Sequence, residues 1–332
     1  MTMTRTRARK LIGVVGWCGA LLVASAAVAQ PVREAVLIQG TSGEPQFAEQ
    51  HRGWLDQMAT TFHEKLMLDP AHLTVLAERA GDGELRSTAE NVRGTFARLA
   101  GTLEASDILF VMLIGHGTAD SASAKFNLVG PDLSVEDWNT LLLPIKSRVV
   151  FVNSSSASFP FAKGMTGDRR IVITSTSSLS QKYATVFADA FVQALNAPAA
   201  DLDKNERVSI WETFFYASRT VKKYFEQKGQ LATERALLED NGDGVGREAL
   251  DPTGEDGTLA TMTYLDAVVG AKPTDPALQM LLQRQEILTT AVDELKRKKA
   301  SMPVEEYDAA WEQLMIELAT VGAEIRAKGG LD

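Results

Sequence analysis

The chain has 332 residues, of which 45% are hydrophobic, and it carries a formal net charge of −9 at pH 7. An acidic surface repels phosphates, so this charge argues against a nucleic-acid partner. The length is enough to bury a large core as one α/β domain with an accessory element.

Residues 1–29 have the pattern of a secretory signal peptide. Four basic residues lie within the first ten, an apolar stretch runs from Leu11 to Ala26, and Ala27-Val28-Ala29 matches a cleavage site. We therefore expect a secreted or periplasmic protein with no membrane span after cleavage. The only cysteine, Cys18, lies in this segment. The mature chain would then have no thiol for catalysis, disulfides or zinc.

Strand and helix patterns alternate between residues 30 and 197. The expected strands are 35–38, 72–76, 107–114, 148–152 and 170–174. The expected helices are 47–68, 85–103, 132–143 and 183–195, with Ser134 as the cap of the third. Strands separated by single helices favour parallel βαβ units. The sequence therefore predicts an α/β fold with a mainly parallel sheet.

Polar residues follow two of the apolar strands. Gly115-His116-Gly117 ends the most apolar one, and the strand at 148–152 continues into Asn153-Ser-Ser-Ser-Ala-Ser158. Open α/β sheets build their sites at the carboxyl ends of strands. The other histidines, His51, His63 and His72, lie within helix or strand patterns and are assigned to surface or core.

The strand–Gly-His-Gly, strand–small-residue order resembles the caspase-like hydrolases, most closely the legumain (asparaginyl endopeptidase) branch. The resemblance covers most of the mature chain and implies a caspase-like three-layer sandwich. In that family the histidine and cysteine strands are neighbours, and the thiol attacks a carbonyl. Matching Ser156-Ala157-Ser158 to the family's Ser-Gly-Ser places Ser154 at the nucleophile position.

The resemblance also implies roles for other residues. His116 would be the general base, and Gly117 with nearby backbone amides would form the oxyanion hole. Ser175 and Ser177 would lie in a wall of the specificity pocket. The chain departs from the family in having serine for cysteine, Ala157 for glycine and Val152 for an acidic residue.

Three functions follow from this pattern. A serine hydroxyl normally needs a histidine oriented by a carboxylate, and no carboxylate obviously adjoins His116 in the sequence. We therefore expect a protein without cysteine-peptidase activity that binds a peptide or protein. The first alternative is an active peptidase with a Ser154–His116 dyad. The second is a structural protein that assembles through its C-terminal helices.

Residues 198–272 are expected to extend the α/β domain with acidic loops and a helix. Oxygen-bearing residues occupy positions 1, 3, 5, 9 and 12 of a calcium-loop pattern, namely Asp201, Asp203, Asn205, Ser209 and Glu212. Position 6, where a sharp turn favours glycine, is Glu206. Calcium is thus the candidate cofactor. Alternatively, Ser209 and Glu212 form a capping box that needs no metal.

Residues 273–332 have the pattern of a helical hairpin with coiled-coil spacing. Apolar residues recur at alternating steps of three and four on both sides of Ser301-Met302-Pro303. The two apolar stripes either pack within the protein or dock a partner or a second copy of the chain. The sequence leaves both arrangements open.

Overall fold

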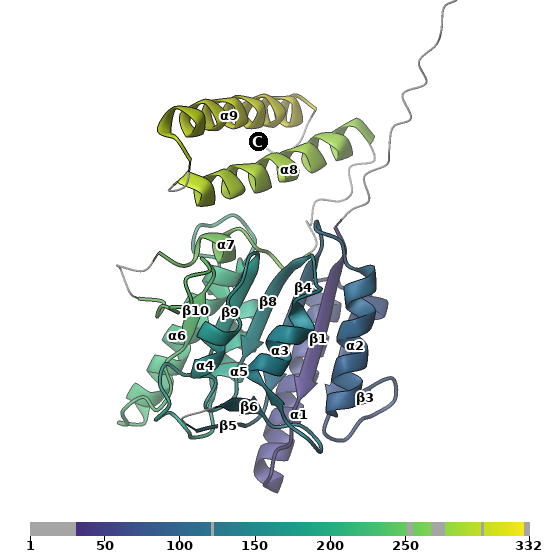
Figure 1. Cartoon of the computed structure of the whole chain (residues 1–332), viewed down its shortest axis with the longest axis vertical. Coiled ribbons are helices and arrows are strands. Elements are labelled where there is room, and N and C mark those ends of the chain that lie inside the picture. The colour runs from purple at the N-terminus through teal and green to yellow at the C-terminus, as the bar shows by residue number, and fades with distance from the viewer. Residues whose placement is uncertain (1–30, 121–122, 251–254, 267–275, 300–301, 329–332) are drawn as a thin grey trace, which may run out of the picture. The chain divides into compact units, whose positions relative to one another are not determined.

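The computed structural model describes residues 31–120, 123–250, 255–266, 276–299 and 302–328 (Figure 1). The predicted signal peptide lies outside the described residues. Within these ranges, no helix is long and apolar enough to cross a membrane.

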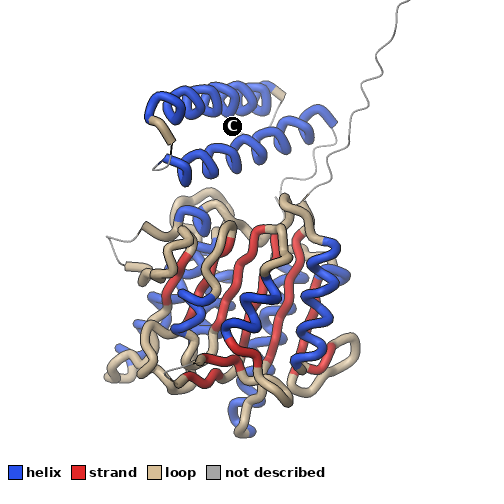
Figure 2. The backbone as a smooth tube through the Cα atoms, in the orientation of Figure 1, coloured by secondary structure: helices blue, strands red, loops and turns tan. Residues whose placement is uncertain are grey.

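A seven-stranded sheet forms the centre of the α/β domain, in the order β10-β9-β8-β4-β1-β2-β3. Its strands are β1 (Arg33–Gln39), β2 (Leu73–Ala77), β3 (Leu85–Arg86), β4 (Ile108–Ile114), β8 (Arg148–Asn153), β9 (Arg170–Thr174) and β10 (Leu237–Glu239). Every pairing is parallel except that of β10 with β9. The expected α/β fold with a mainly parallel sheet is confirmed, and Figure 2 shows the strands side by side.

Helices cover both faces of this sheet. On one face lie α1 (Pro45–Thr60), α5 (Phe187–Asn196) and α6 (Ile210–Gln227), and on the other α2 (Ala89–Thr102), α3 (Val135–Leu142) and α4 (Phe159–Gly164). Successive strand residues point to opposite faces. In β1, Ala35 and Leu37 therefore join the first core, and Val36 and Ile38 join the second. The result is three layers, α/β/α (Figure 1).

Several short elements of the structure were not predicted from the sequence pattern. They are the antiparallel sheet β5 (Gly117–Ala119), β6 (Ala124–Phe126) and β7 (Leu133–Ser134), with η1 (Thr61–Lys65), η2 (Pro70–His72), η3 (Pro198–Ala200), α4, α7 (Thr258–Thr261) and β10. Elements of two to six residues are too short to show a hydrophobic period. The predicted helix at 85–103 is wrong at its start. It begins at Ala89, because Thr88 caps it with a bond to the Asn91 amide.

Two predicted helix caps are confirmed. Ser134 caps α3 in a reciprocal capping box with Asp137, and Ser209 caps α6 in the same way with Glu212. Each pair satisfies two backbone amides that a helix start would otherwise leave unpaired.

The C-terminal helices α8 (Pro276–Lys298) and α9 (Val304–Ala327) contact each other as a hairpin. Leu288, Val292 and Leu295 of the predicted stripe in α8 are buried, as is Val321 of α9. An ion pair between Arg284 and Glu317, at 2.7 Å, also joins the two helices. The predicted hairpin is therefore present.

Candidate functional site

His116 lies directly beyond the carboxyl end of β4, at the edge of the sheet where the predicted site was placed. Its half-buried ring packs edge-on against Phe47 of α1, with centroids 4.8 Å apart, and against His51, at 5.0 Å. Gly115 precedes it with φ +151, in the region that favours glycine, and a Cβ there would lie 3.3 Å from the Gly40 backbone. Glycine therefore lets the chain turn closely past β1.

The two histidines form an uncharged pair at neutral pH. Burial lowers the pKa of His116, and a hydrogen bond to the Ser42 backbone and the charge of Glu44 partly oppose this. Burial, with a contribution from His116, lowers the pKa of His51 to about 4. Glu44 is the carboxylate that the sequence analysis did not find near His116.

His51 itself was missed as a site residue. It was assigned to surface or core, and it is indeed 2% exposed, but it lies against His116. A signal was available, because Trp54 and Met58 follow it at steps of three and four on the buried face of α1. The buried face of α1 therefore begins with His51, which contacts His116 just beyond the end of β4.

Ser154 lies on β8's carboxyl side, next to the end of β4 in the sheet. Its hydroxyl donates to the Leu113 carbonyl at 2.6 Å, and its backbone amide donates to the same oxygen at 3.0 Å. The residue is 1% exposed. Across the described parts of the chain, no hydrogen bond joins the Ser154 hydroxyl to His116. The hydroxyl therefore serves the backbone of β4.

Gly117 is hydrogen-bonded to the serine loop (Ser154–Ser158) and packs closely against it. Its amide donates to the Ser156 hydroxyl, which donates in turn to the Gly117 carbonyl, both at 3.3 Å. A Cβ at Gly117 would lie 2.4 Å from the Ser156 carbonyl oxygen, so a larger residue would push the two segments apart. Ala157 has φ +56, a left-handed conformation that favours the glycine of the resembled family.

The two predicted pocket serines take part in a hydrogen-bond network between the ends of β8 and β9. Ser175 is fully buried and donates its hydroxyl to the Ser155 carbonyl at 2.7 Å. Ser158 accepts from the Ser175 amide at 3.1 Å and the Thr176 amide at 3.2 Å. The half-buried Ser177 donates its amide to the Gln181 side chain at 2.7 Å. These groups connect the two loops.

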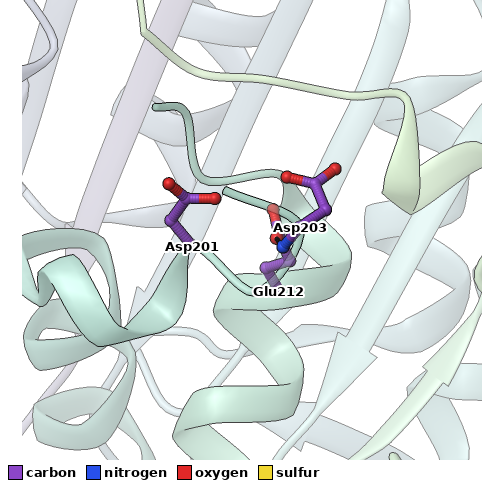
Figure 3. Close-up of side chains that lie close together, drawn as sticks. All are labelled: Asp201, Asp203 and Glu212. Carbon is purple, nitrogen blue, oxygen red and sulfur yellow. Dashed lines mark hydrogen bonds between the residues drawn. The ribbon is translucent and has the colours of Figure 1, made fainter. Parts of the chain in front are cut away.

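The structure brings together three of the predicted calcium ligands (Figure 3). Carboxylate oxygens of Asp201, Asp203 and Glu212 lie within 4.8 Å of one another. Such oxygens are the ligands that calcium prefers. Glu206 adopts φ +67, so the loop makes its sharp turn without glycine.

The same carboxylates also accept hydrogen bonds within the loop. Asp201 accepts from the amides of Asn205 and Glu206, both at 3.1 Å, and Glu212 accepts from the Leu202 amide and the Ser209 hydroxyl, both at 2.8 Å. The Asn205 amide group donates to Asp203 at 2.9 Å. The loop is therefore folded into a ligand-like arrangement by its own backbone.

Comparison with known proteins finds no matching family model and no matching curated protein. Solved structures similar to this chain include a protein of Geobacter sulfurreducens, at 14% identity, 63% of this chain, 93% of that chain and a TM-score of 0.42. Caspase-1 from Spodoptera frugiperda matches at 9% identity, 64% of this chain, 88% of that chain and a TM-score of 0.42.

A secreted C11 cysteine protease from Bacteroides thetaiotaomicron is also similar, at 10% identity, 64% of this chain, 67% of that chain and a TM-score of 0.35. Peptidases of the caspase-like kind are thus among the chain's structural neighbours. The α/β architecture follows from the strand order itself.

Proposed function

We propose that this chain is an exported relative of the caspase-like peptidases, nearest the legumain branch, that lacks cysteine-peptidase activity and binds a peptide or protein segment. The binding site would lie at the carboxyl edge of the sheet around His116. Support comes from the Gly-His-Gly motif after β4 and the small-residue loop after the adjacent strand β8.

The observation that carries this proposal is the bond from the Ser154 hydroxyl to the Leu113 carbonyl, at 2.6 Å. A serine nucleophile needs its hydroxyl proton directed at a base. Ser154 would have to break this buried bond and rotate its side chain to do so. Unmaking a buried hydrogen bond costs about 1–3 kcal/mol, which would add to the reaction barrier.

His116 retains what a binding site needs. Its imidazole is half-buried at a strand end, and burial keeps it neutral. One ring nitrogen donates to the Ser42 backbone, so the other can accept a hydrogen bond from a peptide amide. Extended peptides offer alternating amide donors and carbonyl acceptors. A neutral histidine can therefore hold a peptide without performing chemistry on it.

The decisive experiment compares turnover of a mixed peptide library by the mature protein and by its Ser154→Ala and Ser154→Cys variants. We expect no cleavage by the unaltered protein. Cleavage that disappears in Ser154→Ala would instead establish the serine dyad and refute the proposal. Cleavage gained only in Ser154→Cys would show that the rest of the peptidase site is intact and that the nucleophile alone was lost.

A binding assay then separates the remaining alternative. We expect His116→Ala to weaken peptide capture from the same library. Capture that tolerates His116→Ala but fails when the chain is truncated at Lys272 would favour a structural role for the C-terminal hairpin.

A further inference from the structure

A cavity of about 410 Å³ opens beside His116, at the carboxyl ends of β1 and β2. Its walls come from the end of β1, the start of α1 and the segment after β2. The lining residues that matter here are Gln39, Ser42, Glu44, Glu49, Glu78 and Arg79. Ser42 and Glu44 also act on the His116 ring, through a backbone hydrogen bond and through charge. The cavity and His116 therefore share a wall.

The cavity has an excess of negative charge. Three carboxylates line it, and two guanidinium groups oppose them. Arg52, one of the two, is already paired: it donates to both oxygens of Glu84, at 2.8 and 2.7 Å, and lies 2.8 Å from Asp56. Only the exposed Arg79 remains against three carboxylates. A cation entering the cavity would therefore be attracted.

One deeply buried polar side chain in the cavity wall has no partner. Ser42 is 2% exposed, and its buried hydroxyl has no hydrogen-bond partner within the described residues. Buried polar groups are almost always hydrogen-bonded, so an orphan in this wall points to a missing ligand. The Gln39 side chain, 3% exposed, lines the same cavity. Both groups carry oxygens that accept bonds from an ammonium or guanidinium.

We propose that this cavity binds the cationic side chain of a lysine or arginine in a peptide held next to His116. The inference rests on the proposed peptide-binding function and adds its ligand class. The volume lies within the range of ligand pockets, roughly 300–1,000 Å³. The three carboxylates attract the cation, while Gln39 and Ser42 supply the directed contacts that distinguish it from an apolar side chain.

The test uses five fluorescein-labelled peptides, Gly-Gly-X-Gly-Gly with blocked ends, where X is lysine, arginine, norleucine, citrulline or glutamate. Binding to the mature protein is followed by fluorescence anisotropy at low salt. We expect the lysine or arginine peptide to bind roughly tenfold more tightly than its uncharged counterpart, because hydrogen bonds to a charged group add about that much. Added salt should reduce the difference.

Charge variants in the wall give effects of opposite sign. Glu49→Gln and Glu78→Gln should each weaken binding of the cationic peptide by roughly two- to fivefold, as for exposed ion pairs, and Arg79→Gln should strengthen it. Glu90→Gln, an exposed carboxylate on α2 away from the cavity, is the matched control and should change nothing. These surface changes leave the fold intact, unlike a change at buried Gln39.

The outcomes separate the two proposals. Equal binding of all five peptides would overturn the cationic pocket while leaving peptide binding in place. Preference for the glutamate peptide would overturn it as well, and would indicate an anion held at the start of α1. Failure of every peptide to bind would overturn both proposals.

Discussion

The serine loop, with the adjoining end of β9, and the cavity wall at the ends of β1 and β2 lie on the same edge of one sheet, but their polar groups differ in hydrogen bonding. Ser154 and Ser158 of the serine loop and Ser175 after β9 all bond to protein groups. In the cavity wall, the buried hydroxyl of Ser42 has no partner within the described chain. Hydroxyls that are hydrogen-bonded to the protein stabilise the fold, whereas a buried hydroxyl without a partner can gain a hydrogen bond when a ligand binds.

We expect the largest effect in the pH dependence of the free energy of unfolding, which arises from His51. The pKa of His51 is about 4 in the folded chain, against about 6.5 for the free side chain. The unfolded state therefore binds more protons between these values, so stability falls as pH drops from 6.5 towards 4, by up to about 3 kcal/mol. Urea unfolding at several pH values measures this loss.

His51→Phe is the matched variant, since phenylalanine keeps an aromatic ring beside Phe47 and Trp54. The difference in unfolding free energy between the unaltered protein and this variant should shrink with acid. Burial raises the pKa of Glu234 to about 7 and that of Asp256 to about 6, and these act oppositely in both proteins, so they cancel in the difference. A difference that stays constant from pH 7 to 4 would refute the burial of His51.

The next effect concerns the close approach of Gly117 to the serine loop. Gly117→Ala would place a methyl group 2.4 Å from the Ser156 carbonyl oxygen, so we expect a loss of roughly 2–3 kcal/mol. Gly94→Ala is the control, because no atom lies near its Cβ position within α2. That variant should gain up to about 1 kcal/mol from helix propensity. Equal effects of the two changes would mean that Gly117 of β5 and the serine loop are not in contact.

A serine from each region gives the most direct comparison. Ser158→Ala leaves the buried Thr176 amide without an acceptor and removes one of the two acceptors of the Ser175 amide, which should cost about 2 kcal/mol. Ser42→Ala removes a hydroxyl without a partner and should change the free energy of unfolding by less than about 0.5 kcal/mol. Thermal or urea unfolding measures both. Similar losses would contradict the division between structural and ligand-facing hydroxyls.

These residues also show how much of the structure can be predicted from the sequence. The alternation of apolar strands with amphipathic helices predicts the sheet, and the pattern places β9 at residues 170–174, where the structure has it. It also brings His116 and Ser154 to neighbouring strand ends. The direction of the Ser154 hydroxyl could not be predicted, because it depends on the position of the Leu113 carbonyl in another strand.

Other features of the structure could not be predicted from the sequence, for a different reason. Strand β10 has three residues and pairs antiparallel with β9, and so short an element has no readable period. The cavity wall contains residues from three separated segments, and nothing local marks the Ser42 hydroxyl as unpartnered. The contact of His51 with His116 also arises from packing, although the helical spacing of His51, Trp54 and Met58 already placed it on the buried face.

The smallest effect tests whether polar groups that are already hydrogen-bonded within the protein can also bind a ligand. Asp201, Asp203 and Glu212 are hydrogen-bonded within their loop, like the serine-loop hydroxyls, yet their oxygens converge as calcium ligands do. If calcium binds there with a dissociation constant near 0.1 mM, about 1 mM calcium should stabilise the chain by about 1.4 kcal/mol. Asp203→Asn should remove this gain while Glu90→Gln keeps it, in thermal unfolding with calcium or with magnesium. Stabilisation that survives in Asp203→Asn would place the ion elsewhere. No stabilisation in either protein would mean that the capping box alone accounts for the arrangement, since backbone amides already satisfy the carboxylates that an ion would need.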